Sequence, residues 1–148
     1  MSIFDIPLDI FKEIFELCDF LTKIRFRQIC KYSYENLHMI DLYNIEKKYL
    51  KRLSKNILKK HRFIKYLNVI YNLDIKHISW MKNLKELYAS GNCGIDQKGI
   101  KGLNLIKLNV HDNSKIKKVS FMTSLKKLYA SGNCGIERIG FNQIGCVE

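Results

Sequence analysis

The histidines, cysteines and glycines are the residues whose spacing could mark a catalytic or metal site in this chain. The four histidines, His38, His61, His77 and His111, lie far apart, and none stands in a known nucleophile motif with a cysteine or a serine. No C-x-x-C pair or clustered His/Cys spacing indicates zinc, and the glycines follow no phosphate-binding loop spacing. We therefore expect a non-enzymatic protein without metal or cofactor.

The glycines belong instead to an internal repeat. LKELYASGNCGI (84–95) returns 41 residues later as LKKLYASGNCGI (125–136), with 11 of 12 positions identical. A fainter pair at the same offset, IKYLNVIYNLDI (64–75) and LIKLNVHDNSKI (105–116), fills the gaps between them. The repeating unit is therefore 20 or 21 residues long.

In register, the four units share Leu/Ile-x-x-Leu-x-Ala/Val-x-x-Asn-x-x-Ile. The alternation Leu87-x-Ala89 has the two-residue period of a strand with one buried face. A buried asparagine after such a strand must hydrogen-bond the bending backbone, so we expect a ladder with one asparagine per coil. These asparagines are Asn72, Asn92, Asn113 and Asn133.

This period and pattern resemble the leucine-rich repeat. The resemblance implies a short solenoid over residues 64–148, with one parallel strand per repeat. Together with the helical segment described below, it predicts an α+β fold.

Residues that alternate with the buried ones would line one exposed, concave face of such a sheet. The expected target-binding residues are Tyr66, Asn68, Glu86, Tyr88, Lys107, Asn109, Lys127 and Tyr129, continued by Ile70, Ser90, His111 and Ser131. Tyrosine offers a rigid ring with a polar tip and is a good contact residue. Near-identical repeats also arise by duplication. The repeated tyrosines are therefore explained either by selection for a ligand or by duplication of the repeat unit.

Residues 1–40 form a predicted helical unit. A first helix is expected after Pro7, with Ile10 and Ile14 at helical spacing, and Asp19 and Thr22 are expected to end it and cap a second helix. Two helices this short cannot bury all of their apolar surface alone. The unit is therefore expected to pack on another helix or on a partner.

The stretch IPLDIFKEIFELCDFLTKIRFRQICK (6–31) resembles an F-box, the segment that docks a substrate receptor onto the Skp adaptor of a cullin-RING ubiquitin ligase. The resemblance implies a Skp-type adaptor as partner, bound by Pro7, Leu8, Ile10, Phe11, Ile14, Phe15, Ile24, Ile29 and Cys30. The chain departs from the F-box pattern at Cys18, at Thr22-Lys23 and at Ser33.

The segment 41–63 is predicted to be a basic amphipathic helix of about five turns that caps the first repeat. Its expected apolar stripe is Leu42, Ile45, Tyr49, Leu53 and Ile57, and its expected basic face is Lys47, Lys48, Lys51, Arg52, Lys55 and Lys59. Residues 46–65 hold nine basic residues and one acidic residue, a net charge of +8 in a chain of net charge +12. A basic helix of this kind binds nucleic acid or is simply solvated.

Compartment and chain ends give further expectations. The first ten residues carry acids and no basic region, so no secretory signal is expected, and no apolar run approaches the roughly 20 residues of a membrane span. The five cysteines are then expected to be reduced thiols of an intracellular protein, with Cys93 and Cys134 too far apart for a disulfide. After the fourth repeat, GFNQIGCVE is expected to be too short for a polar cap, so either Phe141, Ile144 and Val147 fold back weakly or the chain is a shortened member of a longer family.

Taken together, these features predict a monomeric adaptor that links a Skp-type protein to a protein target, similar to F-box/leucine-rich-repeat substrate receptors of large DNA viruses of amoebae. The alternatives are a basic nucleic-acid-binding protein and a repeat scaffold without an adaptor.

Overall fold

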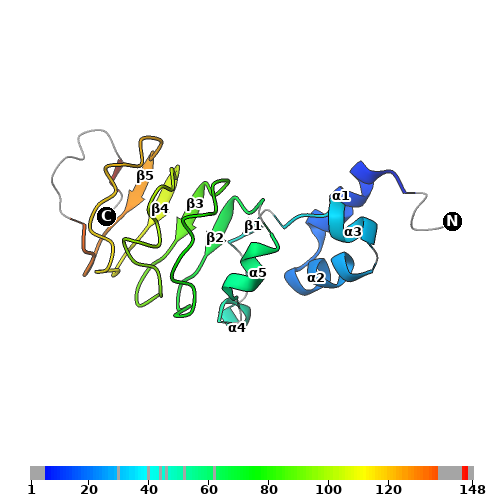
Figure 1. Ribbon diagram of the computed structural model, residues 1–148, viewed down its shortest axis with the longest axis horizontal. Coiled ribbons are helices and arrows are strands. Elements are labelled where there is room, and N and C mark those ends of the chain that lie inside the picture. Colours follow the sequence, from blue (N-terminus) through cyan, green and yellow to red (C-terminus); the bar gives the residue numbers. More distant parts are fainter. Residues whose placement is uncertain are drawn as a thin grey trace. The chain divides into compact units, whose positions relative to one another are not determined.

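The computed structural model describes residues 6–29, 31–39, 41–43, 45, 47–51, 53–61, 63–136 and 145–146. The chain divides into two compact units, Met1–Met39 and Ile40–Glu148. The first unit is helical, and the second contains a parallel sheet with two short helices (Figure 1). The expected α+β class is therefore confirmed. The segment 41–63, expected as a separate linker, lies in the same compact unit as the repeats.

Three helices form the first unit: α1 (Leu8–Leu17), α2 (Phe20–Gln28) and α3 (Lys31–Asn36). Helix α1 begins after Pro7, whose fixed φ suits the entry to a helix. Asp19 caps α2, and its side chain accepts a hydrogen bond of 2.8 Å from the Thr22 backbone N–H. That hydrogen bond is the main cause that lowers the pKa of the Asp19 carboxyl. The predicted break between the first two helices is thus confirmed.

Aromatic rings fill the interior of this unit. Phe11 and Phe15, one helical turn apart on α1, are both buried, and the Phe11 ring lies 5.5 Å from that of Phe26 on α2. At the surface, Lys23 of α2 pairs with Glu16 of α1 at 2.9 Å. One stripe of α1 therefore faces inward and holds the two helices together.

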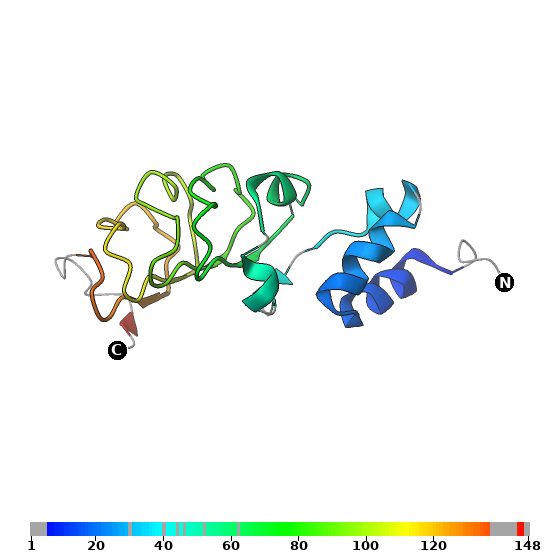
Figure 2. The ribbon, with the colours of Figure 1, turned by 90° about the horizontal axis from the view of Figure 1, so that it is seen from below.

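The sheet of the second unit has six parallel strands in chain order (Figures 1 and 2). They are β1 (Asp41–Leu42), β2 (Tyr66–Asn68), β3 (Glu86–Tyr88), β4 (Lys107–Asn109), β5 (Lys127–Tyr129) and β6 (Gly145–Cys146). Each strand pairs in register with the next, so Leu67, Leu87 and Leu108 stand side by side. The expected strand is present in each of the four repeats. The segments that return from one strand to the next lie on one side of the sheet.

Columns of equivalent side chains form the core on that side. Each repeat contributes a buried aliphatic residue before its strand and a buried leucine within it, and the first three repeats also contribute a buried isoleucine after it. The buried columns are Ile64, Leu84, Leu105 and Leu125; Leu67, Leu87, Leu108 and Leu128; and Ile75, Ile95 and Ile116. Each fully buried leucine or isoleucine contributes about 1.5–3 kcal/mol relative to an exposed one, so the repeats stabilise one another by stacking.

The long helix predicted for residues 41–62 is wrong. The segment begins with strand β1, where Leu42 pairs with Leu67, and continues with two short helices, α4 (Lys47–Leu50) and α5 (Lys55–Lys59). Ser54 starts α5, because its hydroxyl accepts a hydrogen bond of 3.3 Å from the Ile57 N–H. The segment is thus an irregular first coil.

The side chains of this first coil differ from those expected of a continuous amphipathic helix. Leu42, Ile45 and Leu53 are buried as expected, but Leu50 and Leu58 complete the buried set in place of Tyr49 and Ile57. Lys48 on α4, Lys51 in the turn after it, and Lys55 and Lys59 on α5 are exposed, but they do not form one helical face. Arg52 and the side chain of Lys47 lie outside the described residues.

Two of the four expected ladder asparagines are buried, and two are exposed. The Asn72 amide donates to the carbonyls of Leu50 and Leu53, at 2.6 and 2.9 Å, and its oxygen accepts from the N–H groups of Asp74 and Ile75. Asn72 thus ties its own turn to the first coil.

Asn113, two coils further along the chain, forms hydrogen bonds in the same way. Its amide donates to the Ala89 and Ile95 carbonyls at 2.8 and 3.3 Å, and its oxygen accepts from the Lys115 N–H. Each buried asparagine therefore satisfies backbone groups of two neighbouring coils.

Cysteine takes the inward position in the other two coils. Asn92 and Asn133 point outward, while the next residues, Cys93 and Cys134, donate to the Ala89 and Ala130 carbonyls at 3.3 and 3.1 Å. Burial raises the pKa of the Cys93 thiol, which keeps it neutral and able to donate. The expected ladder of one asparagine per coil is therefore wrong, because Ser-Gly-Asn-Cys places the smaller thiol inside. Cys93 and Cys134 are both free thiols.

The last described strand also differs from expectation. Gly145–Cys146 pairs with Lys127 and Leu128 and extends the sheet beyond the fourth repeat. Phe141, Ile144 and Val147, which were expected to fold back, lie outside the described residues.

The alternation of buried asparagine and inward-pointing cysteine predicts that alanine substitutions of two asparagines at the same repeat position have unequal effects on stability. Asn113→Ala removes the amide donor from the Ala89 and Ile95 carbonyls of the preceding coil and the acceptor from the Lys115 N–H of its own coil, and should lower the free energy of unfolding by about 2–4 kcal/mol. Asn92→Ala should lower it by less than about 0.5 kcal/mol, because Asn92 is exposed. Urea unfolding of the full chain measures both. Equal losses would contradict the alternation.

Candidate protein-interaction surfaces

An exposed apolar stripe runs along α1, on a face different from that of Phe11 and Phe15. It consists of Ile10, Ile14 and Leu17, which follow the spacing of one helical face. Leu17 is 88% exposed. Helix α1 is therefore apolar on two faces, and the unit covers only one of them. A helix of this kind normally buries its second face against another protein.

The residues expected to bind the adaptor divide into two groups by burial. Pro7, Ile10, Ile14 and Ile29 are exposed, and Leu8 and Ile24 are half-buried. Phe11 and Phe15 are buried, with Phe15 only 1% exposed, so their assignment to the contact surface is corrected: they belong to the core. Cys30 lies outside the described residues. Leu17 and Leu21 were not expected on the surface, but both are exposed.

Each departure from the F-box pattern has a local role in this unit. The Cys18 thiol donates to the Ile14 carbonyl at 3.2 Å, at the end of α1. Lys23 forms the ion pair with Glu16 that links α1 to α2. Ser33 is fully buried on α3, where a small side chain fits an already filled interior. The three departures are compatible with the packing of the helical unit.

The exposed face of the sheet presents the expected residues in columns. The first column is Asp41, Tyr66, Glu86, Lys107 and Lys127, and the second continues from Asn68 through Tyr88 and Asn109 to Tyr129. Parallel pairing spaces neighbours in a column by about 4.8 Å. The structure therefore brings together all eight residues that the sequence predicts for this face.

The second column is a packed layer. The Tyr43 ring, just after β1, lies 4.4 Å from the Tyr88 ring, and the Asn68 amide between the two strands donates to the Tyr43 carbonyl at 3.3 Å. The Lys107 ammonium lies over the rings of Tyr88 and Tyr129, at 4.9 and 5.5 Å from their centres. Tyr88 is therefore only 8% exposed, and its expected role as a free contact residue is corrected: its ring supports the layer.

The charged and polar groups of this layer form contacts with one another. The Tyr88 hydroxyl donates to the Glu86 carboxylate at 3.2 Å, and the Lys107 ammonium lies 3.7 Å from the same oxygen. Burial raises the pKa of Tyr88, and the hydrogen bond with Tyr88 raises the pKa of Lys107. Lys107 therefore stays protonated at neutral pH, and Tyr88 stays a neutral hydroxyl.

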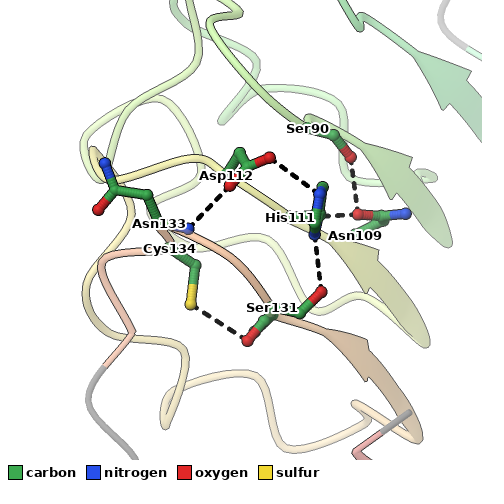
Figure 3. Close-up of polar contacts among 8 residues, drawn as sticks. Ser90, Asn109, His111, Asp112, Ser131, Asn133 and Cys134 are labelled. Atoms are coloured by element: carbon green, nitrogen blue, oxygen red, sulfur yellow. Dashed lines mark hydrogen bonds and ion pairs between the residues drawn. The ribbon is translucent and has the colours of Figure 1, made fainter. Parts of the chain in front are cut away.

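The sheet meets a polar cluster where β4 and β5 end (Figure 3). The two ring nitrogens of His111 lie 2.7 Å from the Ser131 hydroxyl and 2.9 Å from the Asp112 carboxylate. Asp112 also accepts a 2.8 Å hydrogen bond from the Asn133 N–H. Nearby, the Ser90 hydroxyl donates to the Asn109 side chain at 2.7 Å. The cluster thus connects the ends of three neighbouring strands.

Sequence motifs alone did not reveal the contact between His111 and Ser131. The signal was the repeat register, because both residues occupy the third exposed position of neighbouring repeats. Serine, histidine and aspartate can form a nucleophile relay, but such a relay works in a site that excludes water and holds an oxyanion. Both His111 and Asp112 are about half exposed, with side-chain exposures of 49% and 48%. We interpret the contacts of His111 and Asp112 with Ser131 and Asn133 as a set of hydrogen bonds that joins two neighbouring coils, and we call this set the staple.

Comparisons with known proteins give no relative: no family model, curated protein or solved structure matches the chain. None of the helices in the described ranges has both the length and the apolar character needed to cross a membrane. Within the same residues, no group of three or more His, Cys, Asp or Glu side chains is placed to hold a metal ion.

The staple predicts different costs for two equivalent glycine substitutions. Gly91 and Gly132 both have positive φ, at 62° and 66°, so alanine at either position should cost about 1 kcal/mol of stability. A Cβ on Gly91 meets nothing within 4 Å, whereas one on Gly132 would clash with the Asp112 carboxylate. Gly132→Ala should therefore cost about 1 kcal/mol more than Gly91→Ala, by displacing Asp112 from His111 and the Asn133 N–H.

A double-mutant cycle isolates this extra cost. With Asp112→Ala as background, Gly132→Ala should cost no more than Gly91→Ala does in the wild-type chain, as measured by urea unfolding. An unchanged cost of Gly132→Ala in that background would rule out the staple.

Proposed function

We propose that this chain is a non-enzymatic substrate receptor: the helical unit docks on a Skp-type adaptor of a cullin-RING ubiquitin ligase, and the repeats hold a protein target. The observation that carries the proposal is the second apolar face of α1. Ile10, Ile14 and Leu17 stay exposed although Phe11 and Phe15 already fill the interior of the unit. The sequence resemblance of residues 6–31 to an F-box indicates a Skp-type adaptor as the partner of this face.

Energetics support a partner for this face. Covering exposed isoleucine and leucine side chains yields about 25 cal/mol for each Å² removed from water, and a few central apolar side chains carry most of the affinity of an interface. Glu13 is exposed beside the stripe, three residues after Ile10 and four before Leu17, and would form part of a polar rim. An apolar centre with a polar rim is typical of a protein-binding surface.

The repeat unit supplies the second half of the proposal. We assign its coils to the leucine-rich-repeat type on the period of 20 or 21 residues, the strand in each coil and the Asn/Cys alternation. Regular stacking sets the exposed columns at fixed spacing, which gives a rigid surface for a target. Because the helical unit and the repeats are separate compact units, one can bind the adaptor while the other binds the target.

A nucleic-acid-binding protein is the alternative that the charge favours. The expected nucleic-acid element was the basic stretch of residues 46–65, whose lysines a continuous helix over 41–63 would present along one face. Because the segment forms a strand and two short helices, this geometric basis is absent. The positive charge of the segment itself remains.

The apolar stripe predicts which substitutions abolish adaptor binding. Ile10→Glu combined with Ile14→Glu should weaken binding to a purified Skp-type adaptor by more than about 100-fold, because two central apolar contacts become buried charges. Both side chains are exposed, so the variant should keep the helical circular dichroism and thermal midpoint of the wild-type chain. Calorimetric titration measures the affinity.

Leu73→Glu is the matched control, because Leu73 is equally apolar and exposed but belongs to the repeat unit. It should leave adaptor binding unchanged. Phe15→Ala is unsuitable as a test, since Phe15 is buried and its loss should unfold the unit. The assignment fails when the folded wild-type chain does not bind the adaptor, or when the double variant binds it as tightly as wild type.

A further inference from the structure

The positive charge of the chain lies almost entirely in one of its two units. Residues 1–39 contain five basic and six acidic residues, a net charge of −1, whereas residues 40–148 contain 21 basic and eight acidic residues, a net charge of +13. Such an excess attracts partners of opposite charge and speeds their association. A partner of the repeat unit should therefore be acidic.

On the exposed face of the sheet, charge changes sign along the first column. Asp41 and Glu86 stand on β1 and β3, whereas Lys107 and Lys127 stand side by side on β4 and β5. Lys127 is exposed, and no ion pair to it is recorded among the described residues. The β4–β5 end of the face therefore attracts carboxylates, while the β1–β3 end repels them.

The rings of this face leave little room for stacked bases. Proteins that bind single-stranded nucleic acid use aromatic rings with an open face. Here Tyr43 covers Tyr88, and the Lys107 ammonium lies over both Tyr88 and Tyr129. The Tyr88 hydroxyl already donates to Glu86, so the donors that this end of the face offers are the ammonium of exposed Lys127 and the N–H groups of Lys107 beyond its pairing with Glu86, and ammonium groups bind carboxylates well.

We propose that the partner of this face is an acidic segment of a protein, whose carboxylate side chains bind Lys127 and Lys107 across β4 and β5. The inference rests on the proposed function, because it names the chemistry of the target that the repeats hold. It also gives the charge of the repeat unit a role that requires no continuous basic helix. Acidic residues of the segment lie over β4 and β5, away from Glu86 and Asp41.

A fluorescein-labelled oligoglutamate peptide tests the proposal by fluorescence anisotropy with the full chain at moderate salt. The peptide should bind, and Lys127→Glu should weaken binding about tenfold, because a favourable charge contact becomes a repulsive one. Lys127→Gln should weaken it about threefold, since it only removes the contact. Lys98→Glu is the matched control: Lys98 is an exposed lysine in the segment between β3 and β4, and its reversal should change affinity less than about twofold.

Three results would overturn the proposal. The first is no binding of oligoglutamate by the folded chain. The second is an equal loss for Lys127→Glu and Lys98→Glu, which would mean that only the overall charge matters. The third is tighter binding of an oligothymidylate of the same net charge that depends on Lys127, which would make the face a nucleic-acid surface.

The helical-unit variant separates this proposal from the proposed function. Ile10→Glu with Ile14→Glu should lose the adaptor and keep oligoglutamate affinity. Failure of the wild-type chain to bind the adaptor, with oligoglutamate binding intact, contradicts the ligase assignment alone. Adaptor binding without oligoglutamate binding contradicts the acidic partner alone.

Discussion

The structure of the repeat unit depends on satisfying the backbone where each strand ends and the chain turns back. Buried carbonyl and N–H groups in these turns must find partners, and side chains of the adjoining coil supply them. Asn72 and Asn113 each bond backbone groups of two coils, whereas in the coil between them the Cys93 thiol donates to the Ala89 carbonyl of its own turn. Because the asparagines bridge neighbours, the coils stack in fixed register instead of sliding.

That register builds the exposed face. Equivalent positions of successive repeats stand side by side, so residues about 20 apart in the sequence become neighbours in a column. Asparagine and tyrosine alternate along the second column, and the Lys107 ammonium lies over the rings of Tyr88 and Tyr129. A surface assembled in this way is rigid without ligand, which reduces the entropy lost when a target binds.

The sequence predicted the regular parts of this chain well and the irregular parts poorly. Strand positions and the sheet-face columns followed from the repeat period, and the break at Asp19 followed from its capping chemistry. The first coil was missed because Leu42, Ile45, Tyr49, Leu53 and Ile57 also fit a helical stripe. Two signals argued against one continuous helix. Ser54 is a residue type that caps the start of a helix. Met39 and Leu42 are also three residues apart, as are Ile64 and Leu67 at the strand of the first repeat.

Other features had no local signal in the sequence. Asn92 and Asn113 occupy the same aligned position, yet only packing decides that the first points outward and Cys93 inward. Likewise, helical spacing placed both Phe15 and Ile14 on apolar positions of α1, and only the packing of α2 separates the buried stripe from the exposed one.

Hydrogen exchange of the full chain, alone and with a Skp-type adaptor, tests the two-unit account most directly. The account predicts slower exchange only in peptides from residues 6–29. Unchanged exchange there, or slowing in residues 64–136 instead, would contradict it.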